Sequence, residues 1–195
     1  MNIGIYVYEG AEVLDFSGPF EVFTTANRVS DEIVNPFEVF LVSEAGGEVV
    51  ARAGYRVISD YSFHNHPGID VLIVVGGVHT AELEKKSVIE WVAAQAQKAS
   101  MVASVCTGAF ILAKAKVLTN HKVTTHWEDI DELSERFPEL TIIKNVRWID
   151  EGDLITSGGI SAGIDMSLQL VSKLHSLSLA EKTAKQMEFL WLKNS

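Results

Sequence analysis

The only cysteine of this 195-residue chain, Cys106, lies at a predicted turn between a strand and a helix. The small and apolar residues at 101–105 favour a buried strand, and the segment 110–117, after Thr107 and Gly108, has helical character. A strand, a tight turn and a helix in this order make a nucleophile elbow, which holds a side chain at the carboxyl edge of a parallel sheet. The helix N-terminus would offer N–H groups and a positive dipole to a thiolate or an oxyanion. The sequence therefore predicts a reactive thiol, and a buried cysteine that only fills space is the alternative.

Two other side chains have the chemistry to act on this thiol. Asp15 stands between two large apolar residues, so partial burial would raise its pKa and let it pass a proton to a thiolate or a leaving group. An ionised Asp15 would instead raise the pKa of the thiol, and a solvated loop acid or helix cap is the structural alternative. His126 could act as a base for Cys106 or only donate a hydrogen bond to a carbonyl beneath Trp127, and the sequence favours the second.

Two pairs of glycines follow predicted strands. The backbone N–H groups near Gly77 and Val78, with that of Thr107, could bind an oxyanion beside the thiol, although glycines there could equally serve only the turn. For Gly158–Gly159, close packing is the favoured interpretation. The histidines of the segment 64–66 have poor spacing for a metal and no cysteine or acidic companion, so no metal site is expected.

Composition and charge limit the classes of protein and of partner. The chain has 47% hydrophobic and 22% charged residues, a formal net charge of −10 and a pI near 5.0. Proteins that bind nucleic acid or anionic membranes concentrate lysine and arginine, so we expect neither partner and instead a small molecule or a second copy of the chain. With a single cysteine, no basic and apolar leader and no run of about 18 apolar residues, we expect a reduced, cytoplasmic protein.

Strands and helices alternate along the chain. Buried strands are predicted at 3–8, 37–43, 71–75 and 101–105, with hairpins at 49–59 and 146–156. The predicted helices are one with Pro19 in its first turn that ends near 28, one opened by a capping box of Ser87 and Glu90, one at 110–117, one at 162–175, and one from a Ser178 cap to about 192. This order predicts one α/β domain over 1–195, with a mostly parallel sheet covered on both faces. The carboxyl ends of its strands would bring together the loops at 12–19, 76–79, 105–108, 126–127 and 158–163.

Five motifs of the chain resemble one known family. They are 10–19 (Gly-Ala-Glu-Val-Leu-Asp-Phe-Ser-Gly-Pro), 75–77 (Val-Gly-Gly), 103–108 (Ala-Ser-Val-Cys-Thr-Gly), 124–127 (Thr-Thr-His-Trp) and 157–165 (Ser-Gly-Gly-Ile-Ser-Ala-Gly-Ile-Asp). On these motifs the chain, from Ile3 to about Leu174, resembles the ThiJ/PfpI superfamily, which has a class I glutamine-amidotransferase-like, flavodoxin-like fold. That fold is a three-layer sandwich. Segments 14–19 and 104–108 are most similar to its isocyanide hydratase branch and to the sensor domains of AraC-type regulators.

The resemblance implies that Cys106 is the nucleophile of the elbow, that Asp15 is the acid that contacts it, and that the protein is a homodimer. In the hydratase branch the thiol adds to an isocyanide carbon to form a thioimidate, which water converts to an N-substituted formamide while the acid moves the protons. Two differences from the motifs of other family members reduce the number of activities expected of this chain. Thr107 replaces the histidine that follows the cysteine in protease-like members, and no basic helix-turn-helix region accompanies the motifs. We therefore expect neither a protease nor a DNA-binding regulator.

The sequence as a whole predicts a cytoplasmic, homodimeric, cofactor-free lyase of the isocyanide hydratase type. Its catalytic residues would be Cys106 and Asp15, and the residues around its substrate would be Gly77, Val78, Thr107 and His126. One alternative is glyoxalase or deglycase-like action on 2-oxoaldehydes, in which the thiol adds to a carbonyl to form a hemithioacetal. The other is a sensor without catalysis, whose thiol is oxidised or which binds a metabolite.

Overall fold

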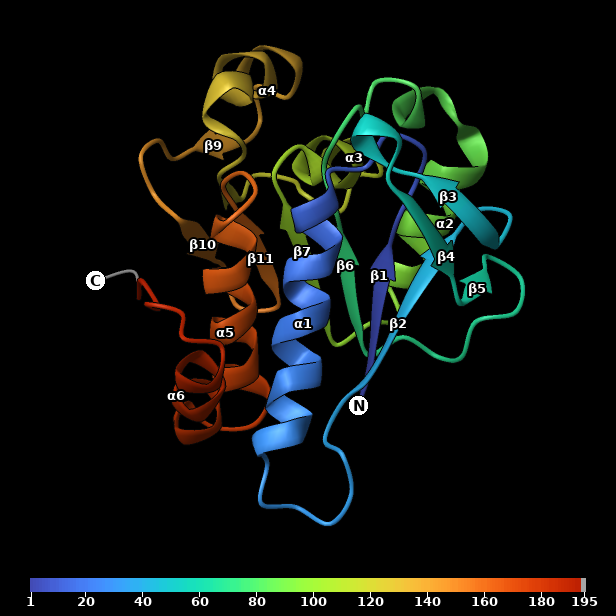
Figure 1. Ribbon diagram of the computed structural model, residues 1–195. Helices are drawn as coiled ribbons and strands as arrows, with labels where there is room; N and C mark the ends of the chain where they lie inside the picture. Colours follow the sequence, from blue (N-terminus) through green and yellow to red (C-terminus); the bar gives the residue numbers. More distant parts are fainter. Residues whose placement is uncertain (194–195) are drawn as a thin grey trace.

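A seven-stranded sheet forms the centre of the computed structural model, which describes residues 1–193 (Figure 1). The strands lie in the order β10-β11-β7-β6-β1-β2-β5, and all neighbours are parallel except β10 and β11. Their bounds are β1 (Asn2–Tyr6), β2 (Glu38–Ser43), β5 (Tyr61–Ser62), β6 (Val71–Val74), β7 (Met101–Val105), β10 (Trp148–Asp150) and β11 (Leu154–Ser157). Two small sheets accompany it, the antiparallel pair β3 (Gly47–Val50) and β4 (Arg56–Ser59) and the parallel pair β8 (Lys122–Val123) and β9 (Thr141–Ile142). The predicted flavodoxin-like, mostly parallel sheet is confirmed.

Helices cover both faces of this sheet (Figure 1). On one face α1 (Val13–Val29), α5 (Ala162–Leu174) and α6 (Leu177–Gln186) pack against one another. On the other face α2 (Lys86–Ala96) packs on α3 (Gly108–Lys114), while α4 (Ile130–Arg136) lies beside β9. Three short 3-10 helices join these elements: η1 (Arg52–Gly54), η2 (Glu82–Glu84) and η3 (Trp127–Asp129).

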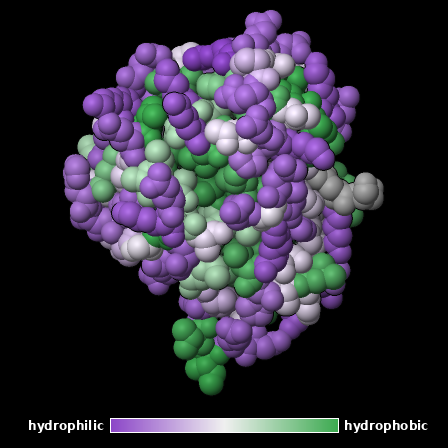
Figure 2. Space-filling view, turned by 180° about the vertical axis from the view of Figure 1, so that it is seen from behind, coloured by the Kyte–Doolittle hydropathy of each residue, from purple (hydrophilic) through white to green (hydrophobic). Residues whose placement is uncertain are grey.

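One face of the molecule is largely polar. Seen from behind, it is mostly hydrophilic, with hydrophobic residues gathered in its middle and at one projecting tip (Figure 2). Within residues 1–193, none of the helices has the length and apolar character needed to cross a membrane.

The central strands β6 and β7 are buried over their whole length. Their near-continuous apolar runs suit a parallel sheet that helices cover on both faces. Val74 of β6 pairs with Tyr6 of β1 and with Ser104 of β7, so the three strands end at the same edge. The loops after these strands therefore converge, as the alternation of elements predicted.

The first helix begins earlier than the sequence predicted. α1 starts at Val13, so Pro19 lies in its interior, and Asp15 lies in its first turn instead of a loop. Proline has no N–H to donate to the carbonyl of Asp15, which is why a helix interior disfavours it. The buried face of α1 packs on β1, β2, α5 and α6, and this tertiary contact outweighs the preference of proline for the start of a helix.

Two predicted helix caps are wrong. Ser87 lies inside α2, and its hydroxyl donates to Glu44 instead of capping the helix. α6 is capped by Ser176, whose Oγ accepts a backbone N–H of the first turn at 3.2 Å, and not by Ser178. The same helix ends at Gln186, before the predicted end near 192. Serine patterns do not define the terminal residue of a helix, because other hydrogen-bond partners compete for the same hydroxyl.

Candidate active site

Cys106 lies at the sharp turn between β7 and α3, where the sequence places an elbow. Its backbone has φ 56°, in the left-handed region that residues with a side chain seldom adopt. Its N–H donates to the carbonyls of Ser157 and Gly158, both at 3.2 Å, and its carbonyl accepts from Thr125 Oγ1 at 2.8 Å. Strained backbone of this kind costs about 1–3 kcal/mol and persists only where its surroundings hold it. The elbow therefore holds a thiol that is only 6% exposed in a defined place.

The turn is tight because backbone from the neighbouring strand lies directly against it. A Cβ atom at Gly76, which follows β6, would stand 2.5 Å from the Thr107 nitrogen and 2.8 Å from the Cys106 Cβ. Only glycine leaves room for this approach. The close contact also brings the Gly76 N–H to the floor of the site.

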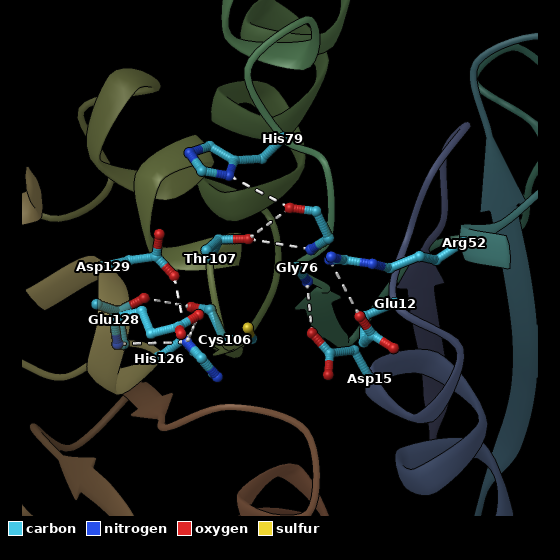
Figure 3. A network of polar contacts seen from close by, with 12 residues as sticks. Glu12, Asp15, Arg52, Gly76, His79, Cys106, Thr107, His126, Glu128 and Asp129 are labelled. Carbon is cyan, nitrogen blue, oxygen red and sulfur yellow. Dashed lines mark hydrogen bonds and ion pairs between the residues drawn. The ribbon is translucent and has the colours of Figure 1, made fainter.

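Asp15 faces the thiol from the first turn of α1 (Figure 3). Its side chain is fully buried, and its Oδ2 accepts a hydrogen bond from the Gly76 N–H at 3.0 Å. Burial raises the pKa of this carboxyl to about 7 against the opposing effect of that hydrogen bond, and the charge of Glu12 adds to the rise. The Cys106 thiol and the backbone of Ile160, which face the carboxyl, moderate it. Asp15 can therefore take up and release a proton near neutral pH.

The thiol itself is protonated in the resting protein. Burial raises the pKa of Cys106 well above its ordinary range, and the nearby charge of Asp15 raises it further. The N–H groups of Thr107 and Ile160 act in the opposite direction, because they stabilise a thiolate, but they do not overcome burial. The site thus gives the sulfur two donors without ionising it, so attack by the thiol requires a base beside it.

The backbone N–H groups around the thiol are of two kinds, those bonded within the protein and those that face the sulfur. Thr107 Oγ1 accepts from the Gly77 N–H at 3.0 Å and donates to the Gly77 carbonyl at 3.1 Å. The Val78 N–H donates to the Gly10 carbonyl at 3.0 Å. Gly77 and Val78 line the cleft over the thiol, but their N–H groups are already used within the protein, whereas those of Thr107 and Ile160 face the sulfur. An oxyanion role for Gly77 and Val78 stays a prediction that would require these bonds to open.

Ile160 is a site residue that the sequence does not reveal. It follows β11, has φ 55° and lines the same cleft as Cys106. The loop 158–163 is predicted at this edge of the sheet, but nothing in the pattern singles out one apolar residue within it. Ile160 acts on the thiol through its backbone N–H. Every residue except proline has this group, so the type of side chain does not reveal its role.

His126 belongs to the wall of the site near Cys106 (Figure 3). It is the N-cap of η3, and its Nδ1 accepts from the Glu128 N–H at 3.4 Å and lies 3.4 Å from Asp129 Oδ2. In the described part of the chain no hydrogen bond joins His126 to Cys106, and the ring receives a backbone N–H instead of donating to a carbonyl. A Cβ atom at Gly159 would stand 2.0 Å from His126 Cδ2, which supports the packing interpretation of this glycine.

A cleft of about 500 Å³ opens over the thiol. The ionised side chains that line it are three carboxylates and one guanidinium, namely Glu12, Glu128, Asp129 and Arg52. A second hollow of about 590 Å³ adjoins the cleft, since His126 and Ile160 line both. A small molecule can therefore reach Cys106, and it does so through acidic surroundings.

Two cleft residues, His79 and Arg52, lie outside the set that the sequence predicts. The His79 ring packs on Phe110 with centroids 4.5 Å apart and is 7% exposed. Burial lowers the pKa of this imidazole, and its Nε2 has no hydrogen-bond partner among the described residues. Arg52 comes from η1 and pairs with Glu12 at 3.3 Å. The position of His79 just after Gly77 at the sheet edge is a usable signal, whereas Arg52 reaches the site only through tertiary packing.

Of the two histidines near residue 65, His66 packs against Trp91 and His64 is exposed. His66 Nε2 accepts from Trp91 Nε1 at 3.1 Å, so Nδ1 carries the proton and donates to the Pro67 carbonyl at 2.7 Å. Both ring nitrogens are thereby used. Across residues 1–193, no group of three or more histidine, cysteine or acidic side chains is placed to hold a metal ion.

Comparisons with known proteins agree on one family. The family model described as DJ-1/PfpI matches residues 1–173. The chain is 31% identical to an isonitrile hydratase of Pseudomonas putida, over 97% of this chain and 78% of that protein. It is 30% identical to the HTH-type transcriptional regulator CdhR of Pseudomonas aeruginosa, over 91% of this chain and 52% of that protein, about half of the regulator's length. The crystal structure of a ThiJ/PfpI family protein from Pseudomonas syringae matches with a TM-score of 0.84 and 26% identity, over 96% of this chain and 74% of that chain.

Proposed function

Because the chain belongs to the DJ-1/PfpI family, we propose that it is a cysteine-dependent hydratase that converts an isocyanide to an N-substituted formamide. The observation that carries this proposal is the buried pair of Asp15 and Cys106, in which a protonated thiol faces a carboxyl with a pKa of about 7. The similarity to a protein named isonitrile hydratase supports the choice of substrate. The reaction adds water without a change of redox state, so the two side chains suffice for it.

In the first step the sulfur attacks the isocyanide carbon. Asp15, in its carboxylate form, takes the thiol proton as the C–S bond forms, because the buried thiol does not ionise by itself. The N–H groups of Thr107 and Ile160 stabilise the negative charge on sulfur. Asp15 then delivers the proton to the former isocyanide carbon, and the product is a thioimidate with a new C–H bond and a C=N bond.

In the second step water displaces the sulfur. A water molecule attacks the thioimidate carbon, and one of its protons passes through Asp15 to the nitrogen. The C–S bond breaks, the oxygen of water becomes the carbonyl oxygen, and the second proton returns to the Cys106 sulfur. One isocyanide and one water give one formamide, and the protein is unchanged.

The proposal is tested by following formamide formation from benzyl isocyanide by NMR. We expect turnover by the wild type and none by Cys106→Ser, because a hydroxyl is a far weaker acid and nucleophile than a thiol. Asp15→Asn should lose about 10²–10⁴-fold in rate, the usual effect of removing a general acid and base. Asp31→Asn, an exposed aspartate paired with Lys182, is the matched control and should keep the wild-type rate. Full activity in Cys106→Ser or in Asp15→Asn would contradict the mechanism.

A sensor without catalysis is the second candidate, because the regulator CdhR matches most of this chain with half of its own length. The cleft would then bind a metabolite, or peroxide would oxidise Cys106, without turnover. Binding without product, or a stable sulfinic acid at Cys106 after mild peroxide, would favour the sensor.

Methylglyoxal in the same assay separates deglycase-like action, in which the thiol adds to an aldehyde. The homodimer also stays a prediction, and light scattering on the native protein measures its mass.

A further inference from the structure

One wall of the Cys106 cleft carries acids that lack the cations found elsewhere on the same segment. Asp131, at the start of α4, pairs with Lys144 at 2.8 Å. The only basic partner of Glu128 and Asp129, in the described part of the chain, is the His126 imidazole, at 3.8 and 3.4 Å. One imidazole, charged only when protonated, thus faces two carboxylates. These two carboxylates therefore have no lysine or arginine partner among the described residues, and the histidine compensates at most one of their charges.

The opposite wall does not change this balance. Glu12 and Arg52 form an ion pair at 3.3 Å and cancel each other. Three carboxylates and one guanidinium line the cleft, so it keeps an excess of two negative charges. A cleft lined by one sign of charge raises the local concentration of ligands of the other sign by about 10–10³-fold.

His79 gives an independent sign of the kind of ligand. Its Nδ1 lies 3.4 Å from the Gly77 carbonyl and so carries the ring proton, which leaves Nε2 as an acceptor. This side chain is 7% exposed and lines the cleft, and Nε2 has no hydrogen-bond partner among residues 1–193. An unsatisfied buried acceptor is costly, and because Nε2 exposes less than 1 Å² of surface, an N–H donor in the cleft would relieve that cost only if the ring shifts.

An exposed aromatic residue lies in the hollow next to the cleft. Trp127 is 76% exposed and lines the second hollow, which shares His126 with the cleft. The face of a tryptophan ring attracts cations, and arginine or ammonium groups bind there together with carboxylates. The carboxylates and His79 therefore line the cleft over the thiol, and the exposed indole lines the hollow that adjoins it.

From this arrangement we infer that the Cys106 cleft selects small molecules that carry an ammonium or guanidinium group, which Glu128 and Asp129 bind while the reactive carbon meets the thiol. The inference deepens the proposed function, and it rests on that function only for the kind of carbon that reacts. The favoured substrate is then a cationic isocyanide, and anionic compounds are rejected by the same charges.

A bound cation would also help the chemistry. The charge of Asp129 is among the causes that raise the pKa of Cys106, and the charge of Glu12 raises the pKa of Asp15. A positive group between these carboxylates opposes both effects. The thiol then ionises more readily when the favoured ligand is in place.

The selectivity can be measured on the thiol without any isocyanide. Three methanethiosulfonates differ in charge, the 2-aminoethyl (cationic), methyl (neutral) and 2-sulfonatoethyl (anionic) compounds. Each forms a mixed disulfide with a thiolate and releases methanesulfinate. For Cys106 we take the ratio of the rate constant with the cationic reagent to that with the anionic reagent. The same ratio for N-acetylcysteinamide gives the intrinsic preference of a free thiol. The first ratio divided by the second measures the preference of the cleft for cations. We expect a preference of about tenfold or more, which salt at about 0.5 M reduces.

Matched variants assign the preference to the two acids. In the double variant Glu128→Gln with Asp129→Asn, the ratio of the cationic to the anionic rate constant should equal that of N-acetylcysteinamide. Glu135→Gln removes an exposed acid of α4 outside the cleft lining and should leave the preference intact. No preference in the wild type, or one that survives in the double variant, would overturn the inference.

The outcomes separate this inference from the proposed function. If isocyanides are not hydrated while the preference depends on Glu128 and Asp129, the cleft binds cations but is not a hydratase. If cationic, neutral and anionic isocyanides are hydrated at equal rates, the hydratase stands and the inference fails. Should the buried thiol react too slowly, NMR titration replaces the reagents. Butylammonium, and not butyrate, should then shift the Trp127 indole and Glu128 amide signals, and the absence of a shift counts against the inference.

Discussion

Two fully buried aspartates lie in the first turns of two helices and have opposite surroundings. Asp15 lies in the first turn of α1, and Asp165 lies in the first turn of α5. Arg147 donates from Nε to Asp165 at 2.8 Å and forms an ion pair with it, and the Leu192 N–H donates to Asp165 Oδ1 at 2.7 Å. Asp15 accepts the Gly76 N–H, but within residues 1–193 it has no ion-pair partner.

The comparison shows that burial alone does not decide what a carboxyl does. A buried carboxylate is stable in its charged form where a cation and donors replace water. Asp165 has both, and it anchors the C-terminal segment, since Trp191 Nε1 also donates to its carbonyl at 3.1 Å. Asp15 lacks the cation, so its pKa rises to about 7 and its proton stays exchangeable beside the thiol. The guanidinium of Arg147 is thus the difference in charge environment between Asp165 and Asp15.

The largest expected effect is the dependence of stability on pH through Asp15. Its pKa is about 7 in the folded protein against an ordinary value of 3.8, so the folded state binds the proton more tightly than the unfolded chain. The stability from this proton is fully present below about pH 4 and is lost as the pH rises to about 7, with a total of roughly 4 kcal/mol. Urea unfolding at several pH values should therefore show that Asp15→Asn gains stability relative to wild type across this range. A constant difference between the two proteins would mean that Asp15 titrates normally.

The next effect concerns Asp165. Asp165→Asn should lower the free energy of unfolding by about 3 kcal/mol at neutral pH, because it leaves Arg147 without its charge partner. The size is at the lower end for a buried pair, since the Arg147 side chain is 33% exposed. Asp15→Asn at the same pH should cause no such loss. Equal destabilisation by the two substitutions would show that the aspartates have the same role and would remove the contrast.

The smallest expected effect is on the thiol. Asp15→Asn removes a negative charge beside Cys106 and should lower the pKa of the thiol. Alkylation by iodoacetamide at about pH 8 should then be faster than in the wild type, because more thiolate is present. Asp165→Asn, whose carboxyl is engaged with Arg147, serves as the control and should react at the wild-type rate. An unchanged rate in Asp15→Asn would show that the acid and the thiol are not coupled.

Several site residues could be predicted because their signal is local. The run into Cys106 and the small residues after it specify a strand, a turn and a helix over a few positions. The sequence predicts Asp15 beside the thiol but in a loop. The loop is predicted because proline is common at the start of a helix, whereas Pro19 lies in the interior of α1. His79 is missing from the predicted site although it ends a loop predicted at this edge. Arg52 could not be predicted, because its place in the cleft depends on how a separate hairpin packs over the sheet edge.

The sequence by itself determined the mostly parallel sheet, the elbow at Cys106 and the set of loops that meet at the carboxyl edge. These follow from short apolar runs, from glycines at turns and from the rule that parallel strands end together. Only the tertiary structure decided that Asp165 meets a guanidinium and that Asp15, expected beside the thiol, is buried without a cation. The reason is physical, because a pKa depends on burial and on charges within a few ångströms, and the groups that supply them come from distant parts of the chain. Gly76 is 61 residues from Asp15, and Arg147 is 18 residues from Asp165.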